Sequence, residues 1–422
     1  MELTIIGTGY VGLVTGACFA KLGHTVTCVD VDQAKVDAIN SGRSPIYEPG
    51  LEEILRTYHS TLQATMDADA AISTGDITFI CVGTPSKKNG AIDLSYVQRT
   101  ATQIGTVLRT LPRRHVVVVK STVVPGTTDT EIRRLLEQHS GKRVGVDVGL
   151  AMNPEFLREG SAINDFLHPD RLVIGVSDST TAKTLRQLYK DFSCPVLETS
   201  LSAAEMIKYA SNAFLATKVS FINEIGNLCK LLGVDAYQVA EGMGYDKRIG
   251  RAFLDAGIGW GGSCFPKDID ALLAWVHDHH AQAPIIAGTR TVNDDQPLRL
   301  IPLLQRHLPS LKGKTIGLLG LAFKPQTDDI RDSRAIPIAT ELLKRGARIK
   351  AYDPKAMNNF KTLFPAIEYC QQAQDVLTAD AILITTKWEE FSTLDFTGKI
   401  VIDGRRLEQA KKTARIYEGV CW

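Results

Sequence analysis

The feature that most constrains the fold is a glycine-rich turn near the start of the chain, placed between a short apolar run and a helical pattern. Residues 3–6 form the run, and Gly7-Thr8-Gly9-Tyr10-Val11-Gly12 follows them directly. The helical pattern continues to Gly23, and a second run at 25–29 leads into Asp30. Strand, glycine turn, helix, strand and acid in this order are typical of the first part of a doubly wound sheet that binds a dinucleotide.

Each glycine of this turn has a different predicted role. Gly7 makes the turn, Gly9 lets a pyrophosphate approach the backbone, and Gly12 lets the helix pack on the sheet. The N-terminus of the helix then faces the phosphates. Asp30 accepts hydrogen bonds from the adenine ribose and repels a 2′-phosphate, so the sequence predicts NAD rather than NADP as the cofactor.

Size and composition narrow the class of protein. At 422 residues the chain is long enough for two or three domains with ample core. A net charge of +1, with Lys and Arg spread evenly, makes neither a nucleic acid nor an anionic membrane an expected partner. No apolar run approaches membrane-spanning length, and Met1 leads almost at once into the first strand, so we expect a cytoplasmic protein without a signal peptide. The eight cysteines have no paired spacing, which argues against a disulfide framework or a zinc site.

Three domains are expected from the order of the patterns. From 1 to 200, strands alternate with helices, and 78–82, 115–119, 149–152 and 172–176 are predicted to be buried parallel strands. From 201 to 310 the pattern is helical. This part opens with Ser202 and Glu205 in the spacing of a capping box, and a long helix follows to Lys230 and a stop near Gly233.

From 311 to 422 the opening of the first domain recurs. A strand at 315–319, a turn at 320–324, a helix at 335–344, Gly346, a strand at 348–352 and Asp353 follow one another, without the three glycines. We expect a second doubly wound domain that binds a different ligand at its strand ends. The predicted fold is therefore α/β, with two Rossmann-like domains joined by a long central helix and a helical middle domain.

The segment with the densest chemistry is Gly257-Ile-Gly-Trp-Gly-Gly-Ser-Cys-Phe-Pro-Lys-Asp268. Its glycines let backbone amides approach a ligand closely. Pro266 suits the first turn of a helix, so Cys264 would precede a helix N-terminus with Lys267 nearby. Both features favour the thiolate over the thiol, and we interpret Cys264 as a nucleophile. The alternative is a small buried cysteine that serves only packing.

Further polar clusters follow buried strands, at the carboxyl ends where ligands bind in open α/β sheets. They lie at 81–86, 120–128 and 153–160. Ordinary strand-to-helix turns rich in capping residues are the alternative reading. Lys208 and Asn212 are four residues apart on the predicted long helix, hence on one face. Apolar neighbours on that helix suggest that Lys208 is buried and faces a site.

Taken together, these segments resemble the nucleotide-sugar 6-dehydrogenases, the UDP-glucose/GDP-mannose dehydrogenase family. The resemblance covers nearly the whole chain, in the segments 7–12, 83–86, 121–126, 153–160, Lys208 with Asn212, 259–268, and Phe323-Lys324 with Arg331. The strings Cys264-Phe265-Pro266-Lys267-Asp268 and Asp165-Phe166…Pro169-Asp170-Arg171 resemble the branch acting on UDP-glucose more than those acting on GDP-mannose or UDP-N-acetylmannosamine.

The resemblance implies a reaction. A primary alcohol is oxidised twice by two NAD, and Cys264 traps the intermediate aldehyde as a thiohemiacetal that becomes a thioester and is hydrolysed. Lys208 stabilises the developing oxyanion, with Asn212 as a second donor. Asp268 and Glu155 are both candidates for water activation and proton transfer, and Thr122 positions a water.

The resemblance also implies which residues bind the ligands. Around NAD they are Gly7, Gly9, Tyr10, Val11, Gly12, Asp30, Lys35, Thr84, Thr122, Glu159, Lys267 and Arg331. Around the sugar nucleotide they are Glu155, Phe156, Leu157, Arg158, Glu159, Lys208, Asn212, Arg251, Phe253, Leu254, Asp255, Ala256, Gly257, Gly261 and Lys324. Arg251 resembles a residue that reaches the substrate of a neighbouring subunit, which implies a homodimer or a higher homo-oligomer. No metal is implied.

Two alternatives from other classes stay open. One is a single-step NAD dehydrogenase of the 6-phosphogluconate type, against which Cys264 argues because that chemistry needs no covalent thiol. The other is a non-catalytic NAD-sensing or scaffold protein with the same fold. The joint presence of Cys264, Lys208, Asn212, Glu155 and Asp268 argues against it.

Overall fold

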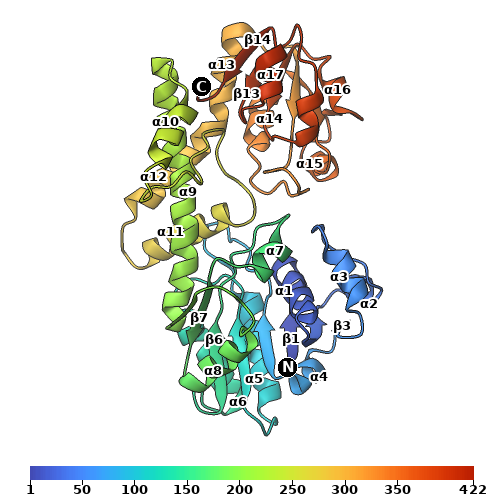
Figure 1. The fold of residues 1–422 in the computed structure, drawn as a ribbon, viewed down its shortest axis with the longest axis vertical. Helices are drawn as coiled ribbons and strands as arrows, with labels where there is room; N and C mark the ends of the chain where they lie inside the picture. The colour runs from blue at the N-terminus through green and yellow to red at the C-terminus, as the bar shows by residue number, and fades with distance from the viewer. The chain divides into compact units, whose positions relative to one another are not determined.

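The computed structural model describes residues 1–422, and these form two compact units, Met1–Ala210 and Ser211–Trp422. Each unit contains one open sheet of doubly wound topology (Figure 1). The predicted α/β class with two Rossmann-like sheets and a helical region between them in sequence is confirmed. The division into three domains stays a prediction. No helix combines the length and the apolar character that crossing a membrane requires.

The sheet of the first unit has eight strands in the order β3-β2-β1-β4-β5-β6-β7-β8. Their bounds are β1 Glu2–Ile6, β2 Thr25–Val29, β3 Leu62–Thr65, β4 Ile77–Ile80, β5 His115–Val119, β6 Val148–Met152, β7 Leu172–Val176 and β8 Val196–Thr199. The strand order reverses between β1 and β4. Ligands of such sheets bind in the crevice outside the carboxyl strand ends at this point.

One predicted strand runs in the other direction. β7 was expected to be parallel to its neighbours, but it pairs antiparallel with β6. The chain between these strands remains at the carboxyl end of the sheet, where it forms the 153–160 segment and the short helix α7, Ala162–Leu167. β7 therefore begins near the carboxyl end of β6, because no crossover helix carries the chain back to the amino-terminal end of the sheet.

Helix α1, Tyr10–Lys21, packs so closely on the sheet that nearly all of its residues are buried. Gly7 has a φ of +97°, and a Cβ on Gly12 would collide with the Gly7 carbonyl, so both glycines are required by the turn. The other helices of the unit are α2 Gln33–Asn40, α3 Leu51–Thr57, α4 Ala68–Thr74, α5 Ser95–Leu108, the π-helical η1 Thr128–Ile132, α6 Arg133–Ser140 and α8 Ser179–Leu188.

The predicted long helix is α9, Leu201–Leu232, green in Figure 1, and it runs from the first unit into the second. The predicted capping box at its start is wrong. Ser200, not Ser202, caps the helix by accepting a hydrogen bond from the Ala203 amide at 3.3 Å. The Glu205 carboxylate instead accepts the amides of Gly126 and Thr128, at 2.5 and 2.7 Å, because a distant loop offers it donors in a buried place.

The second unit holds the rest of α9, a set of helices and a six-stranded parallel sheet. The helices before the sheet are α10 Ala236–Gly244, α11 Phe265–Asp278, α12 Pro284–Asp295, η2 Gln296–Arg299 and α13 Leu300–His307. The strands are β9 Thr315–Leu319, β10 Arg348–Tyr352, β11 Glu368–Tyr369, β12 Ala381–Ile384, β13 Ile400–Asp403 and β14 Ile416–Gly419, and the intervening helices are α14 Ala335–Lys344, α15 Met357–Leu363, α16 Ala373–Val376, η3 Glu389–Thr393 and α17 Glu408–Thr413. Their order, β11-β10-β9-β12-β13-β14, repeats the arrangement of the first six strands of the chain.

We expect Gly12→Ala to lower the free energy of unfolding by about 1–3 kcal/mol, because the new methyl group meets a backbone carbonyl that cannot move aside. Gly9→Ser is the matched control, since no heavy atom lies within 4 Å of a Cβ at Gly9 and serine is a good N-cap. Thermal unfolding of both variants measures the difference. A Gly12→Ala protein as stable as the Gly9→Ser protein would contradict this account of the turn.

Candidate functional site

The start of α1 offers an open anion-binding position. Gly9 is its N-cap, no side chain caps the helix, and no heavy atom lies within 4 Å of a Cβ at Gly9. The first amides of the helix therefore lack a protein acceptor on this side, and the positive end of the helix is exposed to a ligand phosphate. This geometry fits the pyrophosphate of a dinucleotide.

Asp30 lies at the end of β2 beside this turn. Its Oδ2 accepts the Thr8 amide at 2.9 Å and lies 3.6 Å from Lys35 Nζ, and its Oδ1 accepts the Asp32 amide at 3.1 Å. Partial burial opposes ionisation, but the hydrogen bonds from Thr8 outweigh it, so the pKa of Asp30 is lowered. The carboxylate is charged at neutral pH and keeps lone pairs free for a ribose hydroxyl. An added 2′-phosphate would be repelled.

The other predicted cofactor residues of the first unit lie near the carboxyl strand ends. Thr84 is buried after β4, and Thr122 is half-buried after β5. The Tyr10 hydroxyl donates a hydrogen bond to the buried Glu48 carboxylate, which also accepts a hydrogen bond from the Gly160 amide at 2.7 Å. Glu48 thus links the start of α1 to the end of the 153–160 segment, which carries the predicted Glu159.

Lys208 and Glu155 form a buried ion pair. Lys208 Nζ, on α9, is 2.7 Å from both the carboxylate and the main-chain carbonyl of Glu155. The second carboxylate oxygen accepts the Leu157 amide at 2.7 Å. Burial alone would raise the pKa of Glu155, but the Lys208 ammonium outweighs it and the pKa is lowered. Both side chains are less than a tenth exposed, as the sequence pattern predicted for Lys208.

The rest of the 153–160 segment is more open. The Phe156 ring lies 3.9 Å below the Arg171 guanidinium. Arg158 is exposed and forms a two-pronged contact with Asp165, with Nη2 to Oδ1 at 2.7 Å and Nε to Oδ2 at 3.0 Å.

In the second unit, Cys264 is the N-cap of α11 and is half-buried, with Pro266 in the first turn as predicted. One turn further, the buried Asp268 accepts a hydrogen bond from Asn212 Nδ2 at 2.6 Å and pairs with Lys267 Nζ at 2.8 Å. The Asp268 amide also donates to the Cys264 carbonyl at 2.9 Å. The thiol therefore stands at the positive end of a helix, one turn from an amide–carboxylate–ammonium array.

The glycine-rich loop before Cys264 is fixed by buried amide side chains. Asn223 Oδ1 accepts the Gly257 amide at 2.7 Å, and Asn293 makes two hydrogen bonds to the main chain of Trp260, at 2.7 and 3.0 Å. A Cβ on Gly261 would collide with the Asp332 carbonyl, and the Gly262 amide donates to the Arg331 carbonyl at 2.8 Å. The loop is thus held against the turn that follows β9.

The other predicted substrate residues of this unit vary in exposure. Leu254 and Ala256 are buried, whereas Phe253 is exposed with a left-handed φ of +65°. Arg251 Nη2 pairs with Asp255 at 2.5 Å. Lys324 lies beside the Phe323 ring, with Nζ 5.6 Å from its centroid. The exposed Arg331 forms a bidentate ion pair with Asp329.

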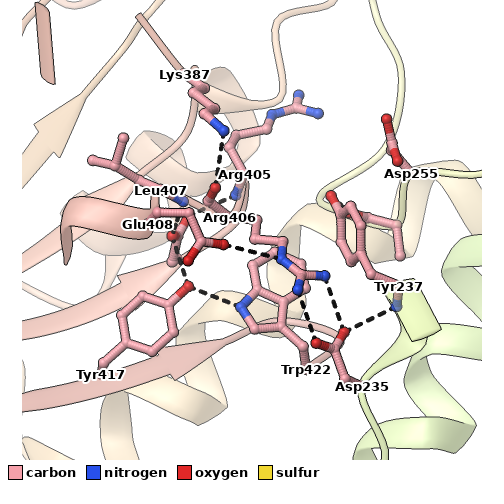
Figure 2. Close-up of polar contacts among 12 residues, drawn as sticks. Asp235, Tyr237, Asp255, Lys387, Arg405, Arg406, Leu407, Glu408, Tyr417 and Trp422 are labelled. Carbon is pink, nitrogen blue, oxygen red and sulfur yellow. Dashed lines mark hydrogen bonds and ion pairs between the residues drawn. The ribbon is translucent and has the colours of Figure 1, made fainter. Parts of the chain in front are cut away.

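Sequence reasoning missed Arg405, which follows β13 (Figure 2). Its Nε donates to the Thr385 carbonyl at 2.9 Å, its Nη2 is 3.4 Å from the Gly259 carbonyl, and it forms no ion pair. A Cβ on Gly257 would stand 3.5 Å from its Nη1, so the guanidinium borders the glycine loop. Burial lowers the pKa of Arg405 to about 10, which leaves it charged at neutral pH. Its position at a strand end was the signal available in the sequence.

The neighbouring Arg406, unlike Arg405, is paired with a carboxylate. It pairs with Asp235 at 3.0 Å and stacks on the Tyr237 ring, with 4.0 Å from guanidinium carbon to ring centroid (Figure 2). Lys387 Nζ donates to its main-chain carbonyl at 3.1 Å. Arg406 therefore holds the 404–407 turn against the start of α10, and Asp235 compensates its charge. Arg405 has no such counter-ion.

The first unit has an open turn for a dinucleotide at the start of α1, which is typical of NAD-dependent dehydrogenases, and the second unit has a thiol at the N-terminus of α11. Three family models of the UDP-glucose/GDP-mannose dehydrogenase family match the chain: the NAD-binding domain at residues 1–193, the central domain at 202–295 and the UDP-binding domain at 317–410. The chain belongs to this family.

Individual relatives agree over nearly their whole length. The chain is 48% identical over 419 residues to the UDP-glucose 6-dehydrogenase of Haloferax volcanii, covering 96% of this chain and 97% of that protein. It is 39% identical to the GDP-mannose 6-dehydrogenase of Pseudomonas putida, with both chains fully covered. The solved UDP-glucose dehydrogenase of Pyrobaculum islandicum is 45% identical with a TM-score of 0.96, covering 100% of this chain and 98% of that one.

We expect Lys208→Met to destabilise the first unit at pH 7 by about 3–5 kcal/mol, because Glu155 is left as an unpaired buried charge. The loss should shrink as the pH falls toward 4, since the unpaired carboxyl can then take up a proton. In the wild-type protein, stability changes with pH in the opposite direction. The lowered pKa of Glu155 contributes stability at neutral pH, and this contribution is lost on acidification.

Calorimetric unfolding across this pH range measures the effect. The double variant Lys208→Met/Glu155→Gln should recover much of the stability, and Lys183→Met, at an exposed position of α8, is the control. Additive losses in the double variant would contradict a direct pair.

Proposed function

We propose that the chain catalyses the NAD-dependent twofold oxidation of UDP-glucose at C6 to UDP-glucuronate. The observation that carries this proposal is the position of Cys264 at the N-terminus of α11, one turn before the Asn212–Asp268–Lys267 array. Two relatives whose names state UDP-glucose as substrate match almost the entire chain and support the choice of sugar nucleotide.

NAD, when bound, supplies the hydride acceptor for each of the two oxidations. Between them, the Cys264 sulfur adds to the aldehyde carbon, and the proton of the thiol goes to the aldehyde oxygen to give a thiohemiacetal. Loss of the second hydride and of the hydroxyl proton leaves a thioester. Water then cleaves the carbon–sulfur bond, which gives the carboxylate, restores the thiol and releases one proton.

The surrounding side chains handle negative charge and protons in these steps. Lys208 and Asn212 stabilise the oxygen anion of the reacting carbon. Glu155 and Asp268 are the two candidates for taking a proton from the alcohol or the hydrolytic water, and Thr122 positions that water. Each carboxylate is buried and held by a cation, Lys208 for Glu155 and Lys267 for Asp268.

The second sheet supplies the charges for the UDP group in this proposal. Arg405 is a cation without a counter-ion at the edge of the glycine loop, where a diphosphate can be bound by the guanidinium and loop amides together. Lys324 adds a second cation from the turn after β9. The family model that matches this region is named for UDP binding.

We extend the proposal to assembly and location. On α9, Phe214, Phe221 and Leu228 are 64%, 46% and 53% exposed and recur every seven residues, so they form one apolar stripe. Burial of this stripe against a second copy supports a homodimer or a higher homo-oligomer. All eight cysteines are thiols, which supports the reducing cytoplasm as the place of work. Sedimentation of the active enzyme measures the assembly, and a fully active monomer would contradict it.

The ratio of NADH formed to UDP-glucose consumed tests the function. We expect two, because the oxidation proceeds to the acid, and NADP should be a poor oxidant because Asp30 is ionised. A ratio of one would instead indicate a single-step dehydrogenase, and no NADH a sensor. The same assay with UDP-galactose, GDP-mannose and UDP-N-acetylmannosamine measures the preference for the sugar nucleotide.

Variants of Cys264 test the covalent step. In Cys264→Ser the ester formed hydrolyses less readily than a thioester, so we expect a UDP-glucuronyl adduct visible by mass spectrometry. Cys264→Ala should form no adduct yet still bind UDP-glucose, since the glycine loop and Lys324 are unchanged. Output of acid should collapse in both. Acid production by Cys264→Ala at a near wild-type rate would show that the thiol is only structural.

A further inference from the structure

Lys120 is a buried cation whose role neither the fold nor the proposed reaction explains. It directly follows β5, in which every residue is buried, and is itself 5% exposed. Its Nζ donates one hydrogen bond, to Asn153 Oδ1 at 2.9 Å, and no carboxylate lies within ion-pair distance. A lysine buried in this way is rare, because removing its charge from water is costly and here no carboxylate in direct contact offsets that cost.

The acceptor of this hydrogen bond is the first residue of the segment that presents Glu155. Asn153 directly follows β6, and its Oδ1 also accepts the Tyr189 hydroxyl at 2.7 Å. Its Nδ2 donates to the Val173 carbonyl of β7 at 2.9 Å. The Asn153 side chain is therefore fixed from three sides, and Lys120 helps to set the point from which Pro154 and Glu155 leave the sheet.

Lys120 also acts on the Glu155–Lys208 pair through its charge. Both ammonium groups favour the ionised form of Glu155 and contribute to its lowered pKa. Two ammonium groups and one carboxylate leave a net charge of +1 in a place shielded from water. Without Lys120, the carboxylate would cancel the charge of Lys208.

We propose that Lys120 is a positioning residue for the oxidation: by adding a second positive charge beside the Glu155–Lys208 pair, it keeps the net charge there positive, so that the group stabilises negative charge on the reacting oxygen of the substrate. This proposal rests on the proposed function. Lys120 itself does not touch the substrate, and its effect passes through Asn153 and Glu155.

The pH dependence follows from the groups that face Lys120. These are Cys81 after β4, Glu155 after β6, Tyr189 after α8 and Lys208 on α9. Burial lowers the pKa of Lys120 to about 8, while it raises the pKa of Cys81 to about 12 and that of Tyr189 as well. The charge of Lys120 is therefore present at pH 7 and is lost as the pH rises through about 8. In the wild-type enzyme, kcat should fall over the same range.

Lys120→Met keeps the length of the side chain and removes its charge. We expect kcat at pH 7 to fall about tenfold, less than the 100- to 1000-fold typical of removing a donor at the oxyanion itself. KM for UDP-glucose should change by less than about threefold, because ground-state binding is untouched. The fall of kcat near pH 8 should disappear. Lys120→Arg, which stays charged, should retain most of the rate and move the fall to higher pH.

Tyr189→Phe is the matched control, since it removes a hydrogen bond to the same Asn153 oxygen without removing charge, and the fall of kcat should stay at the same pH. Wild-type kcat and an unchanged pH profile in Lys120→Met would overturn the proposal. If that variant does not fold, Lys120→Arg decides, and a fall at the wild-type pH would overturn it. The NADH ratio of the wild-type enzyme, measured alongside, separates this outcome from a failure of the proposed function itself.

Discussion

The buried ion pair between Lys208 and Glu155 is the contact that fixes the start of the long helix on the first sheet. It joins α9 to the segment leaving β6, so the long helix begins from a fixed point on the first sheet. Removing one partner of such a pair leaves an unpaired charge in a site shielded from water. Neither residue can therefore be substituted alone without a large loss of stability. The same dryness strengthens the field that the ammonium exerts on a nearby developing charge. One interaction thus contributes to stability and, in the proposed reaction, to catalysis.

Asn212, one turn along the same helix, already belongs to the second unit and has its carboxylate partner there. Asp268 receives its amide and the Lys267 ammonium within the first turn of α11, the helix that begins at Cys264. Successive turns of α9 therefore present a cation and an amide donor, each fixed by a different carboxylate. Because each donor is fixed before a substrate arrives, little reorganisation is needed when charge develops. Glu155 and Asp268 therefore each have a structural role that does not depend on the proton transfers proposed for them.

The sequence predicted those parts of the molecule whose requirements are local. The glycine turn at 7–12, the strand that leads into Asp30 and the proline after Cys264 each leave a pattern within a few residues, and the structure has them in place. The direction of β7 and the partner of Glu205 were predicted wrongly, because both are decided by distant segments: the chain that stays at one edge of the sheet, and the amides of Gly126 and Thr128. Arg405 was missed for the same reason, since its uncompensated charge is visible only in three dimensions.

Asp30 and Asp353 occupy the same place in two sheets of the same strand order, yet they differ in function. Asp353 is fully buried, and its Oδ2 accepts the amides of Leu321 and Ala322 and the indole of Trp388, so the chain itself fills the position of a ribose. Asp30 is partly exposed, and its corresponding oxygen accepts only the amide and the hydroxyl of Thr8. Asp353 therefore has no exposed carboxylate oxygen to offer a ribose, and a cation without a counter-ion lies instead after β13, at Arg405. A repeated fold thus binds two ligands in two ways because the loops, and not the sheets, decide which groups are left unsatisfied.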